Sequence, residues 1–310
     1  MKVKTLFHSL FILASLQAAL LCADAMAQPP QGRGWPSQEP DPANLYTVTC
    51  GDVSMTVDAG LGARIRSFRL GEREILSQLR FPNSFGSTFW LSPQANWNWP
   101  PVPEHDRLPY VVSRNGEGNL VMTSSLSEKF PYRISKEFIP LGDKGALKVK
   151  YTVVNEGEGE CSIAPWEISR VAAGGVIFFD APPRTITPEG LMDFKSEYGA
   201  CWYTFDEQPK NRKINADGHG WLAFANGEGL LLVKKFEDLS EGDPAPLEAE
   251  IQVYVNAGKT YIELEGQGRY TTLALGESLS WEVEWYLLPY GGEPVPSQEL
   301  VSLVRGVIEK

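Results

Sequence analysis

The stretch EAEIQVYVN, residues 248–256, decides the fold class. Apolar side chains occupy every second position from Ala249 to Val255, and polar side chains alternate with them. SWEVEWYLL, residues 280–288, repeats the pattern. A period of two is typical of a β-strand with one buried face. Both segments are therefore predicted to be half-buried strands of an outer sheet.

Strand signals continue along the chain as short runs rich in Val, Ile, Tyr, Phe and Trp that end at Gly, Pro, Asn or Asp. One helix is predicted, at the C-terminus, where Ser297 can cap a segment with Leu300, Val304 and Val307 at helical spacing. Many strands with almost no helix exclude a parallel βαβ architecture. The sequence predicts an all-β fold, a large antiparallel β-sandwich with a short C-terminal helix. The further strands are predicted at 46–50, 54–57, 63–70, 120–124, 132–139, 146–155, 160–170, 220–225, 230–236 and 259–265.

Residues 1–27 have the pattern of a secretory signal. Lys2 and Lys4 precede an apolar run that ends at Leu21, and Ala-Met-Ala at 25–27 is a cleavage site. The run is shorter than the ~20 residues that span a membrane. We expect a periplasmic or secreted protein with no membrane insertion after cleavage. A lipoprotein with Cys22 at its start is a less favoured alternative, because lipid attachment requires a small residue before the cysteine.

Residues 28–44 carry five prolines and no apolar period, so we expect a disordered arm or linker there. Residues 45–310 are predicted to form a single domain. Cys50, Cys161 and Cys201 allow at most one disulfide, and their spacing matches no zinc site.

Composition narrows the function. The chain of 310 residues is 43% apolar, so it can bury a core, and its net charge of −11 disfavours nucleic acids and anionic membranes as partners. It contains no phosphate-binding glycine loop, nucleophile elbow or His-rich zinc motif. No cofactor and no metal are predicted, and the sequence leaves the oligomeric state open.

The stretch FGSTFWLSPQANWNWPPVPEHDRLPY, residues 85–110, is rich in tryptophan and proline. Its prolines disfavour regular structure, so we expect an aromatic loop that presents indole faces to a cleft where sugar C–H groups stack. The alternative is that the tryptophans plug one end of the sandwich. The candidate residues are Trp90, Gln94, Trp97 and Trp99 for binding and His105 for proton transfer.

TYIELEGQGRY, residues 260–270, places Tyr261, Glu263 and Glu265 on one face of a strand, with the two carboxylates about 7 Å apart. Like charges on one face raise at least one pKa, which suits a general base or acid. Solvated surface charge is the alternative.

IAPWEISRV, residues 163–171, places Trp166, Glu167 and Arg170 in a partly buried strand. A buried charge requires a partner. A structural Glu167–Arg170 pair and a binding site are equally good expectations for this segment.

GARIRSFRLGEREIL, residues 62–76, resembles the opening hairpin of galactose mutarotase-like (aldose 1-epimerase-like) proteins. The resemblance covers roughly residues 45–290, and WLSPQANWNWPP, residues 90–101, is most similar to an exported branch of that superfamily. The other motifs in the same order are the Trp–Pro loop, the strand end at 153–155, the Leu-Glu-Gly-Gln segment at 264–267 and the turn at 275–277.

The resemblance implies a β-supersandwich whose concave sheet binds carbohydrate. In the epimerases a glutamate takes the proton of the anomeric hydroxyl and a histidine protonates the ring oxygen. Glu265 matches the glutamate. Where the family has the histidine, this chain has Pro-Trp-Glu at 165–167, so Glu167 or His105 would have to supply the proton.

Three hypotheses follow. We favour an exported carbohydrate-binding protein with Glu265 at the centre of its site. Trp90, Trp97, Trp99 and Trp166 stack on the sugar, and Gln94 and Arg170 form hydrogen bonds with it. Whether it is an enzyme stays open; an active protein would be an aldose epimerase-like isomerase or another carbohydrate-active enzyme, with Glu265 as base. The alternative is a non-enzymatic envelope or assembly module with no sugar ligand.

Overall fold

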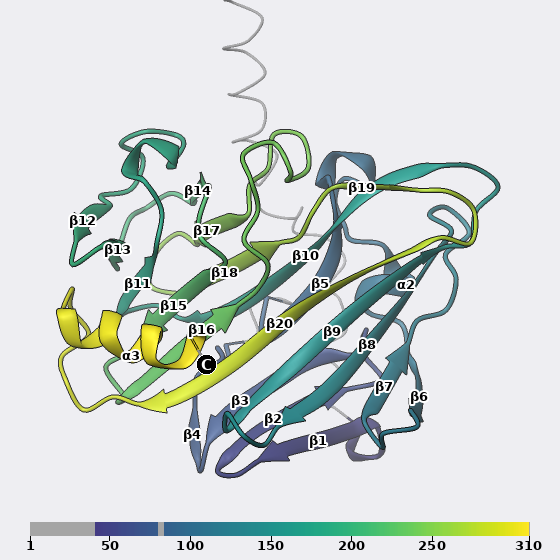
Figure 1. Cartoon of the computed structure of the whole chain (residues 1–310), viewed down its shortest axis with the longest axis horizontal. Helices are drawn as coiled ribbons and strands as arrows, with labels where there is room; N and C mark the ends of the chain where they lie inside the picture. The colour runs from purple at the N-terminus through teal and green to yellow at the C-terminus, as the bar shows by residue number, and fades with distance from the viewer. Residues whose placement is uncertain (1–40, 80–83, 310) are drawn as a thin grey trace, which may run out of the picture. The chain divides into compact units, whose positions relative to one another are not determined.

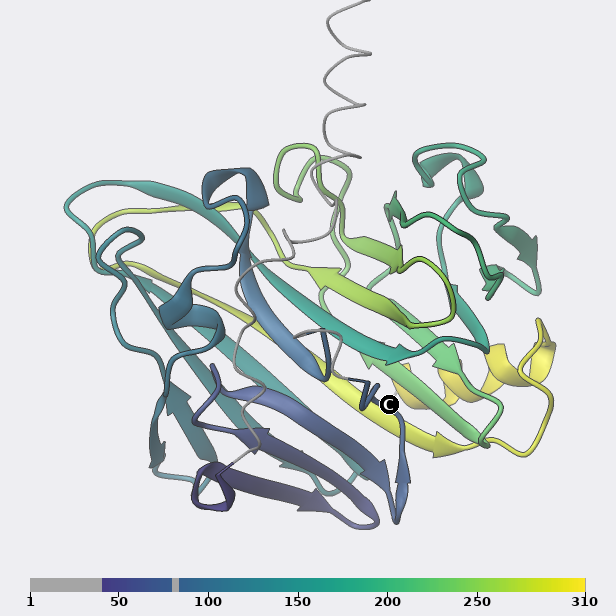
Figure 2. The same cartoon turned by 180° about the vertical axis from the view of Figure 1, so that it is seen from behind.

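Two large antiparallel sheets form the computed structural model, which describes residues 41–79 and 84–309 (Figures 1 and 2). The predicted signal, residues 1–27, and residues 28–40 of the predicted arm lie outside the described residues. The arm's last residues form a short turn, capped by Asp41, that leads directly into the first strand. The predicted sandwich with a short C-terminal helix is confirmed.

Sheet I has the strand order β1-β2-β3-β5-β10-β18-β17-β14, with β4 paired to β3 and β19 paired to β10. Its strands are β1 (Leu45–Cys50), β2 (Val53–Asp58), β3 (Arg64–Leu70), β4 (Arg73–Glu74), β5 (Ser87–Ser92), β10 (Cys161–Ala172), β14 (Arg212–Ala216), β17 (Ile251–Val255), β18 (Tyr261–Gln267) and β19 (Thr271–Leu273).

Sheet II has the strand order β12-β13-β11-β15-β16-β20-β9-β8-β7-β6. Its strands are β6 (Val111–Arg114), β7 (Leu120–Thr123), β8 (Tyr132–Leu141), β9 (Ala146–Asn155), β11 (Val176–Phe179), β12 (Lys195–Glu197), β13 (Ala200–Thr204), β15 (Trp221–Ala225), β16 (Leu230–Lys235) and β20 (Ser278–Pro289).

The helical elements are short except for the last one. They are η1 (Pro42–Asn44), η2 (Gln94–Asn96), α2 (Pro103–Asp106), η3 (Pro183–Thr185) and α3 (Gln298–Ile308). Ser297 caps α3 as predicted, because its hydroxyl accepts a hydrogen bond from the Leu300 N–H at 3.3 Å. The buried face of α3 packs on sheet II. None of the described helices is both long and apolar enough to span a bilayer.

The main core lies between the two sheets. Phe89 of β5 stacks on Tyr151 of β9 at 4.1 Å, and Phe68 of β3 meets Trp285 of β20 edge-on at 5.2 Å. Burying each such side chain contributes roughly 1.5–3 kcal/mol. Alternate residues of sheet I therefore face sheet II, and we call this the inner face. The residues between them lie on the outer face, which carries the candidate site.

Two predicted features of this sheet were wrong. Trp90 lies within strand β5 rather than in a loop, because the prolines begin only after Ser92. Strand β17 was predicted to have one exposed face, yet every residue from Ile251 to Val255 is buried. Its apolar side chains face the core, and its polar ones belong to the densely packed outer face.

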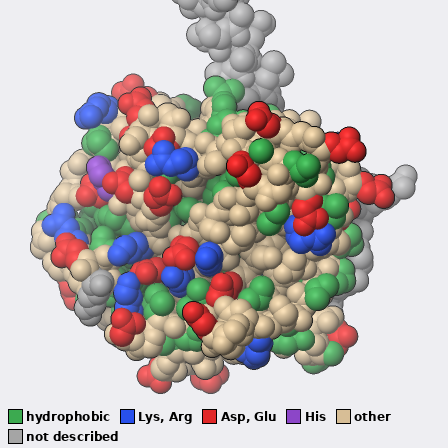
Figure 3. All heavy atoms as spheres, turned by 45° about the vertical axis from the view of Figure 1, so that its right-hand side comes forward, with side chains coloured by type: hydrophobic (Ala, Val, Ile, Leu, Met, Phe, Trp, Pro, Cys, Tyr) green, Lys and Arg blue, Asp and Glu red, His purple; other side chains and the backbone are tan. Residues whose placement is uncertain are grey.

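The surface is electrostatically mixed. On the side shown in Figure 3, Lys and Arg side chains lie among Asp and Glu side chains, and single-sign patches are small. Among the described residues, Cys50, Cys161 and Cys201 are free thiols.

Candidate functional site

Four indole rings gather at one end of the outer face. Trp90 is their centre, with ring centroids 5.4 Å from Trp166, 5.7 Å from Trp97 and 6.1 Å from Trp99, all edge to face. Trp90 and Trp166 are direct cross-strand partners on β5 and β10. Trp99 is the accessible member at 44% exposure, whereas the other three are buried. The predicted stacking residues are thus brought together.

Hydrogen bonds fix two of the indoles. The Nε1–H of Trp90 donates to Asp106 Oδ1 at 2.9 Å, and that of Trp97 donates to the Leu91 carbonyl at 2.6 Å. Asp106 is itself held by Arg64, at 3.3 Å. Its backbone presses on Gly62, where a Cβ would lie 2.0 Å from the Asp106 carbonyl oxygen and where φ is +63°. Only glycine fits this turn, so α2 can approach Trp90.

Glu265 lies beside the indoles on β18. Trp166 donates its Nε1–H to Glu265 Oε2 at 2.9 Å, and Lys213 of β14 contacts the same oxygen at 2.9 Å. The Lys213 ammonium also lies 4.8 Å from the centroid of the Trp166 ring. The Glu265 side chain is out of contact with solvent, and this burial raises its pKa, with the Lys213 charge opposing the rise.

The second carboxylate oxygen of Glu265 is the unusual feature. Oε1 is buried and has no hydrogen-bond partner among the described residues, whereas both partners converge on Oε2. A buried acceptor without a donor costs about 1–3 kcal/mol, more when it is charged. Such an atom can accept a hydrogen bond from a group outside the described residues.

Arg170 lies on the same face. Its Nε donates to Glu263 Oε1 at 2.8 Å, and its guanidinium carbon lies 5.6 Å from the Trp90 ring centroid. The predicted shared face of Glu263 and Glu265 is confirmed by the strand register. The expected Glu167–Arg170 pair was wrong, because residues three positions apart on a strand point to opposite faces, and Arg170 pairs with Glu263 instead.

Glu167 lies on the inner face, between the sheets. Lys234 of β16 contacts its Oε1, and the Tyr151 hydroxyl donates to its Oε2. Lys234 also donates to the Ser169 hydroxyl at 2.9 Å. Glu167 is therefore separated from Glu265 by the sheet itself, although the two residues lie on paired strands.

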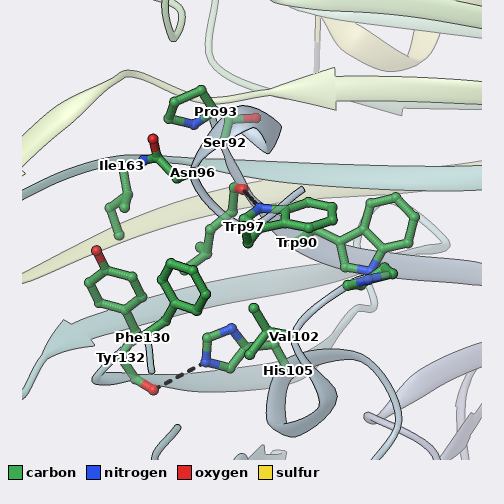
Figure 4. Close-up of a pocket in the computed structure, with 12 residues that line it drawn as sticks. Trp90, Ser92, Pro93, Asn96, Trp97, Val102, His105, Phe130, Tyr132 and Ile163 are labelled. Atoms are coloured by element: carbon green, nitrogen blue, oxygen red, sulfur yellow. Dashed lines mark hydrogen bonds between the residues drawn. The ribbon is translucent and has the colours of Figure 1, made fainter. Parts of the chain in front are cut away.

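His105 lines a pocket of about 260 Å³ next to the indoles (Figure 4). Its Nε2 lies 3.3 Å from the Tyr132 carbonyl oxygen, so that nitrogen carries the proton and Nδ1 is the acceptor. Burial lowers the pKa of His105 to about 4. The imidazole is therefore neutral at pH 7, and the structure shows no contact between it and Glu265.

A junction of three side chains connects the aromatic loop to sheet I. Glu248 accepts from the backbone N–H of Gln94 at 2.8 Å and from Gln267 Nε2 at 2.7 Å. Gln267 also donates to the Ser92 hydroxyl at 2.8 Å. Gln94 is thus held at the site through its backbone. Its side chain is half-buried, and a role of that side chain in binding stays a prediction.

Comparison with known proteins bears on the fold. No protein-family profile matches the sequence, and no curated protein matches it significantly. A candidate aldose 1-epimerase from Escherichia coli K12 superposes with a TM-score of 0.57 at 15% identity, covering 79% of this chain and 99% of its own. A galactose mutarotase-like protein from Lactobacillus casei ATCC 334 superposes with a TM-score of 0.56 at 13% identity, covering 79% and 100%. The chain has the galactose mutarotase-like fold.

The mutarotase-like architecture extends over most of the described chain. A galactose mutarotase related enzyme from Lactobacillus acidophilus gives a TM-score of 0.53 at 9% identity, covering 81% of this chain and all of its own. At such identities the likeness concerns the fold, and the ligand has to be inferred from the side chains at the site.

Sequence analysis missed Lys213 and Glu248. Lys213 lies on β14, a strand of five residues whose alternation is too short to stand out, and it reaches Glu265 because β14, β17 and β18 are neighbours. Glu248 was read as the start of a strand, whereas it ends the loop before β17. Among the described residues there is no group of three His, Cys, Asp or Glu side chains that could hold a metal ion.

Proposed function

We propose that this protein binds a saccharide on the outer face of sheet I, beside the indoles around Trp90 and the carboxylate of Glu265. Indole faces stack on the C–H groups of a sugar ring, and a carboxylate accepts hydrogen bonds from its hydroxyls. The observation that carries the proposal is the convergence of four tryptophans with a buried carboxylate whose Oε1 has no donor among the described residues.

The charges around Glu265 fit a neutral ligand. Glu265 is balanced by Lys213, and Glu263 is balanced by Arg170. A neutral ligand leaves both ion pairs in place, and a small shift of the side chains that cover Glu265 would let one of its hydroxyls donate to Oε1. A charged ligand would have to compete with one of these pairs and pay the desolvation of both charges.

Aldose-epimerase-type chemistry is a second candidate function. A carboxylate whose pKa is raised by burial is a stronger base than an ordinary carboxylate and is better suited to take and return a proton. Glu265 would take the anomeric O–H proton, the bond from the anomeric carbon to the ring oxygen would break, and that oxygen would accept a proton. Lys213 is the cationic donor on the same face, whereas Glu167 faces the core and His105 is neutral.

The binding test uses tryptophan fluorescence. Titration with D-glucose, D-galactose, D-mannose and their oligosaccharides should change the emission of the wild type, and Trp97→Ala should reduce the change strongly. Trp221→Phe is the matched control, since Trp221 is buried beside α3. A flat response to every sugar would overturn the proposal and favour the envelope or assembly module.

The catalytic test is polarimetry on freshly dissolved α-D-glucose or α-D-galactose. Catalysed mutarotation that disappears in Glu265→Gln would support the epimerase function. A rate equal to the uncatalysed rate, together with saccharide binding, would leave binding as the function.

Export also remains a proposal and is supported by the signal pattern at residues 1–27. Expression of the full chain in a bacterial host, followed by fractionation and N-terminal sequencing, tests it. A mature protein that begins near Gln28 outside the cytoplasm is expected, and an uncleaved cytoplasmic chain would contradict the proposal.

A further inference from the structure

The pocket beside the indoles differs chemically from the surface around Glu265. Twelve residues line it, and apart from Ser92, Asn96 and His105 they are aromatic, aliphatic or proline. None of the twelve carries a charge at pH 7, because burial keeps His105 neutral. Trp166 and Glu265 are not among them.

The polar groups of the two indoles already have hydrogen-bond partners. The Nε1–H groups of Trp90 and Trp97 donate to Asp106 and to the Leu91 carbonyl. The two indoles therefore offer carbon surfaces to the pocket. Figure 4 shows these rings, with Phe130, arranged around the space.

A bare sugar ring does not suit this space. It carries a hydroxyl on nearly every carbon, and each hydroxyl buried without a partner is costly. The Ser92 hydroxyl already accepts from Gln267, and the Asn96 side chain is exposed. Nδ1 of His105 is an acceptor in the pocket lining, on the side of the imidazole turned toward Trp97 in Figure 4.

The geometry points to a ligand that is a substituted saccharide, whose uncharged, largely apolar substituent fills the pocket lined by Trp97, Val102, His105 and Phe130. This inference rests on the proposed saccharide site: Trp90 contacts Trp166 and also lines the pocket, so the pocket adjoins the proposed position of the sugar ring. The volume of about 260 Å³ is below the roughly 300–1,000 Å³ of typical ligand pockets, which fits a single small group.

Two kinds of substituent have this chemistry. An acetamido group combines a methyl group with an N–H that can donate to His105 Nδ1, and an aryl aglycone offers a flat apolar ring without a donor. Calorimetric titrations of the full chain should therefore compare D-glucose with N-acetyl-D-glucosamine and with phenyl β-D-glucopyranoside, and should repeat the comparison in the galactose series. We expect at least one substituted sugar in each series to bind about tenfold more tightly than its parent.

Variants of the pocket residues test whether the preference for substituted sugars arises in this pocket. Val102→Phe fills the pocket, so the affinity ratio of substituted to parent sugar should fall to about one. Val112→Phe is the matched control, since Val112 is also half-buried but lies on β6 of sheet II, and it should keep the wild-type ratio. Thermal unfolding monitored by circular dichroism confirms that each variant is folded.

His105→Phe distinguishes an acetamido from a phenyl substituent. It also replaces Val102→Phe as the test variant if Val102→Phe does not fold. It keeps a ring in place and removes the acceptor, so a preference for the acetamido sugar should disappear while a preference for the phenyl glycoside persists. Parent sugars that bind as tightly as substituted ones, with a ratio that Val102→Phe leaves unchanged, would overturn the inference and leave the proposed function intact. Absence of binding by every sugar would overturn both.

Discussion

Strands β10 and β18 carry two buried glutamate–lysine pairs on opposite faces of sheet I, and the two carboxylates use their oxygens differently. On the inner face, Lys234 forms an ion pair at Glu167 Oε1, which accepts no hydrogen bond from the described residues, and the Tyr151 hydroxyl donates to Oε2. On the outer face, Lys213 and Trp166 both contact Oε2 of Glu265, and Oε1 has no partner among the described residues. The inner carboxylate has a contact at each oxygen, whereas both contacts of the outer one converge on Oε2, which leaves Oε1 for the ligand that we propose.

The lysines of the two pairs also differ, because Lys234 is buried and Lys213 is partly exposed. The Lys234 side chain is 1% exposed, and desolvation lowers its pKa while Glu167 opposes the shift. The Lys213 side chain is 19% exposed at the edge of the site. A buried ion pair is seldom a large source of stability, but losing one partner leaves an uncompensated charge. The two pairs should therefore respond differently to mutation.

The largest expected effect is the loss of Lys234. Lys234→Met should lower the free energy of unfolding by about 3–5 kcal/mol, because it leaves Glu167 charged and buried between the sheets. Lys213→Met should cost less, about 1–3 kcal/mol, because Lys213 is 19% exposed and Trp166 still donates to Glu265 Oε2 in the variant. Urea unfolding monitored by circular dichroism measures both. Equal decreases in the free energy of unfolding for Lys234→Met and Lys213→Met would contradict the proposed difference between the inner and outer glutamate–lysine pairs.

A third buried carboxylate, Glu250, extends the comparison because backbone groups hold it. It accepts from the N–H of Gly220 at 2.8 Å and of Leu239 at 3.0 Å, and burial raises its pKa from 4.5 to about 7. A raised carboxyl pKa means that the folded state binds the proton more tightly. Its stabilising contribution is therefore present below pH 4.5 and is lost as the pH rises through 7.

The pH dependence of unfolding tests this contribution. The free energy of unfolding of the wild type minus that of Glu250→Gln should fall by of order 3 kcal/mol between pH 4.5 and 7. The difference between the two proteins is the quantity to measure, because burial of His105 lowers its pKa and gives the opposite slope in an overlapping range. A difference that stays constant over this range would show that Glu250 titrates normally.

A smaller effect is expected at Trp90. Trp90→Phe removes the hydrogen bond to Asp106 and should lower the free energy of unfolding by about 1–3 kcal/mol. Trp99→Phe is the control, because Trp99 is 44% exposed, and it should cost less than about 0.5 kcal/mol. Chemical denaturation measures both, and a smaller loss for Trp90→Phe than for Trp99→Phe would contradict the arrangement of the indoles.

The sandwich could be predicted from the sequence because alternation at period two is a local property that each strand shows by itself. The meeting of Trp166 with Glu265, which are 99 positions apart, depends on β10 pairing with β18. No local pattern specifies that pairing; the family resemblance placed both residues in the site. The separation of Trp166 from Glu167 could have been predicted, since neighbours on a strand point to opposite faces.

The central claim is that Glu265 binds the saccharide. Sugar binding by the Glu265→Gln variant tests this claim most directly. The amide keeps the volume of the side chain and an acceptor toward Trp166 and Lys213, so the free energy of unfolding should change by less than about 1 kcal/mol. Affinity for the best-binding sugar, measured by calorimetry, should fall at least tenfold because the charged acceptor at Oε1 is lost. A variant that keeps wild-type affinity, or one that unfolds as readily as Lys234→Met, would show that Glu265 is a structural residue like Glu167.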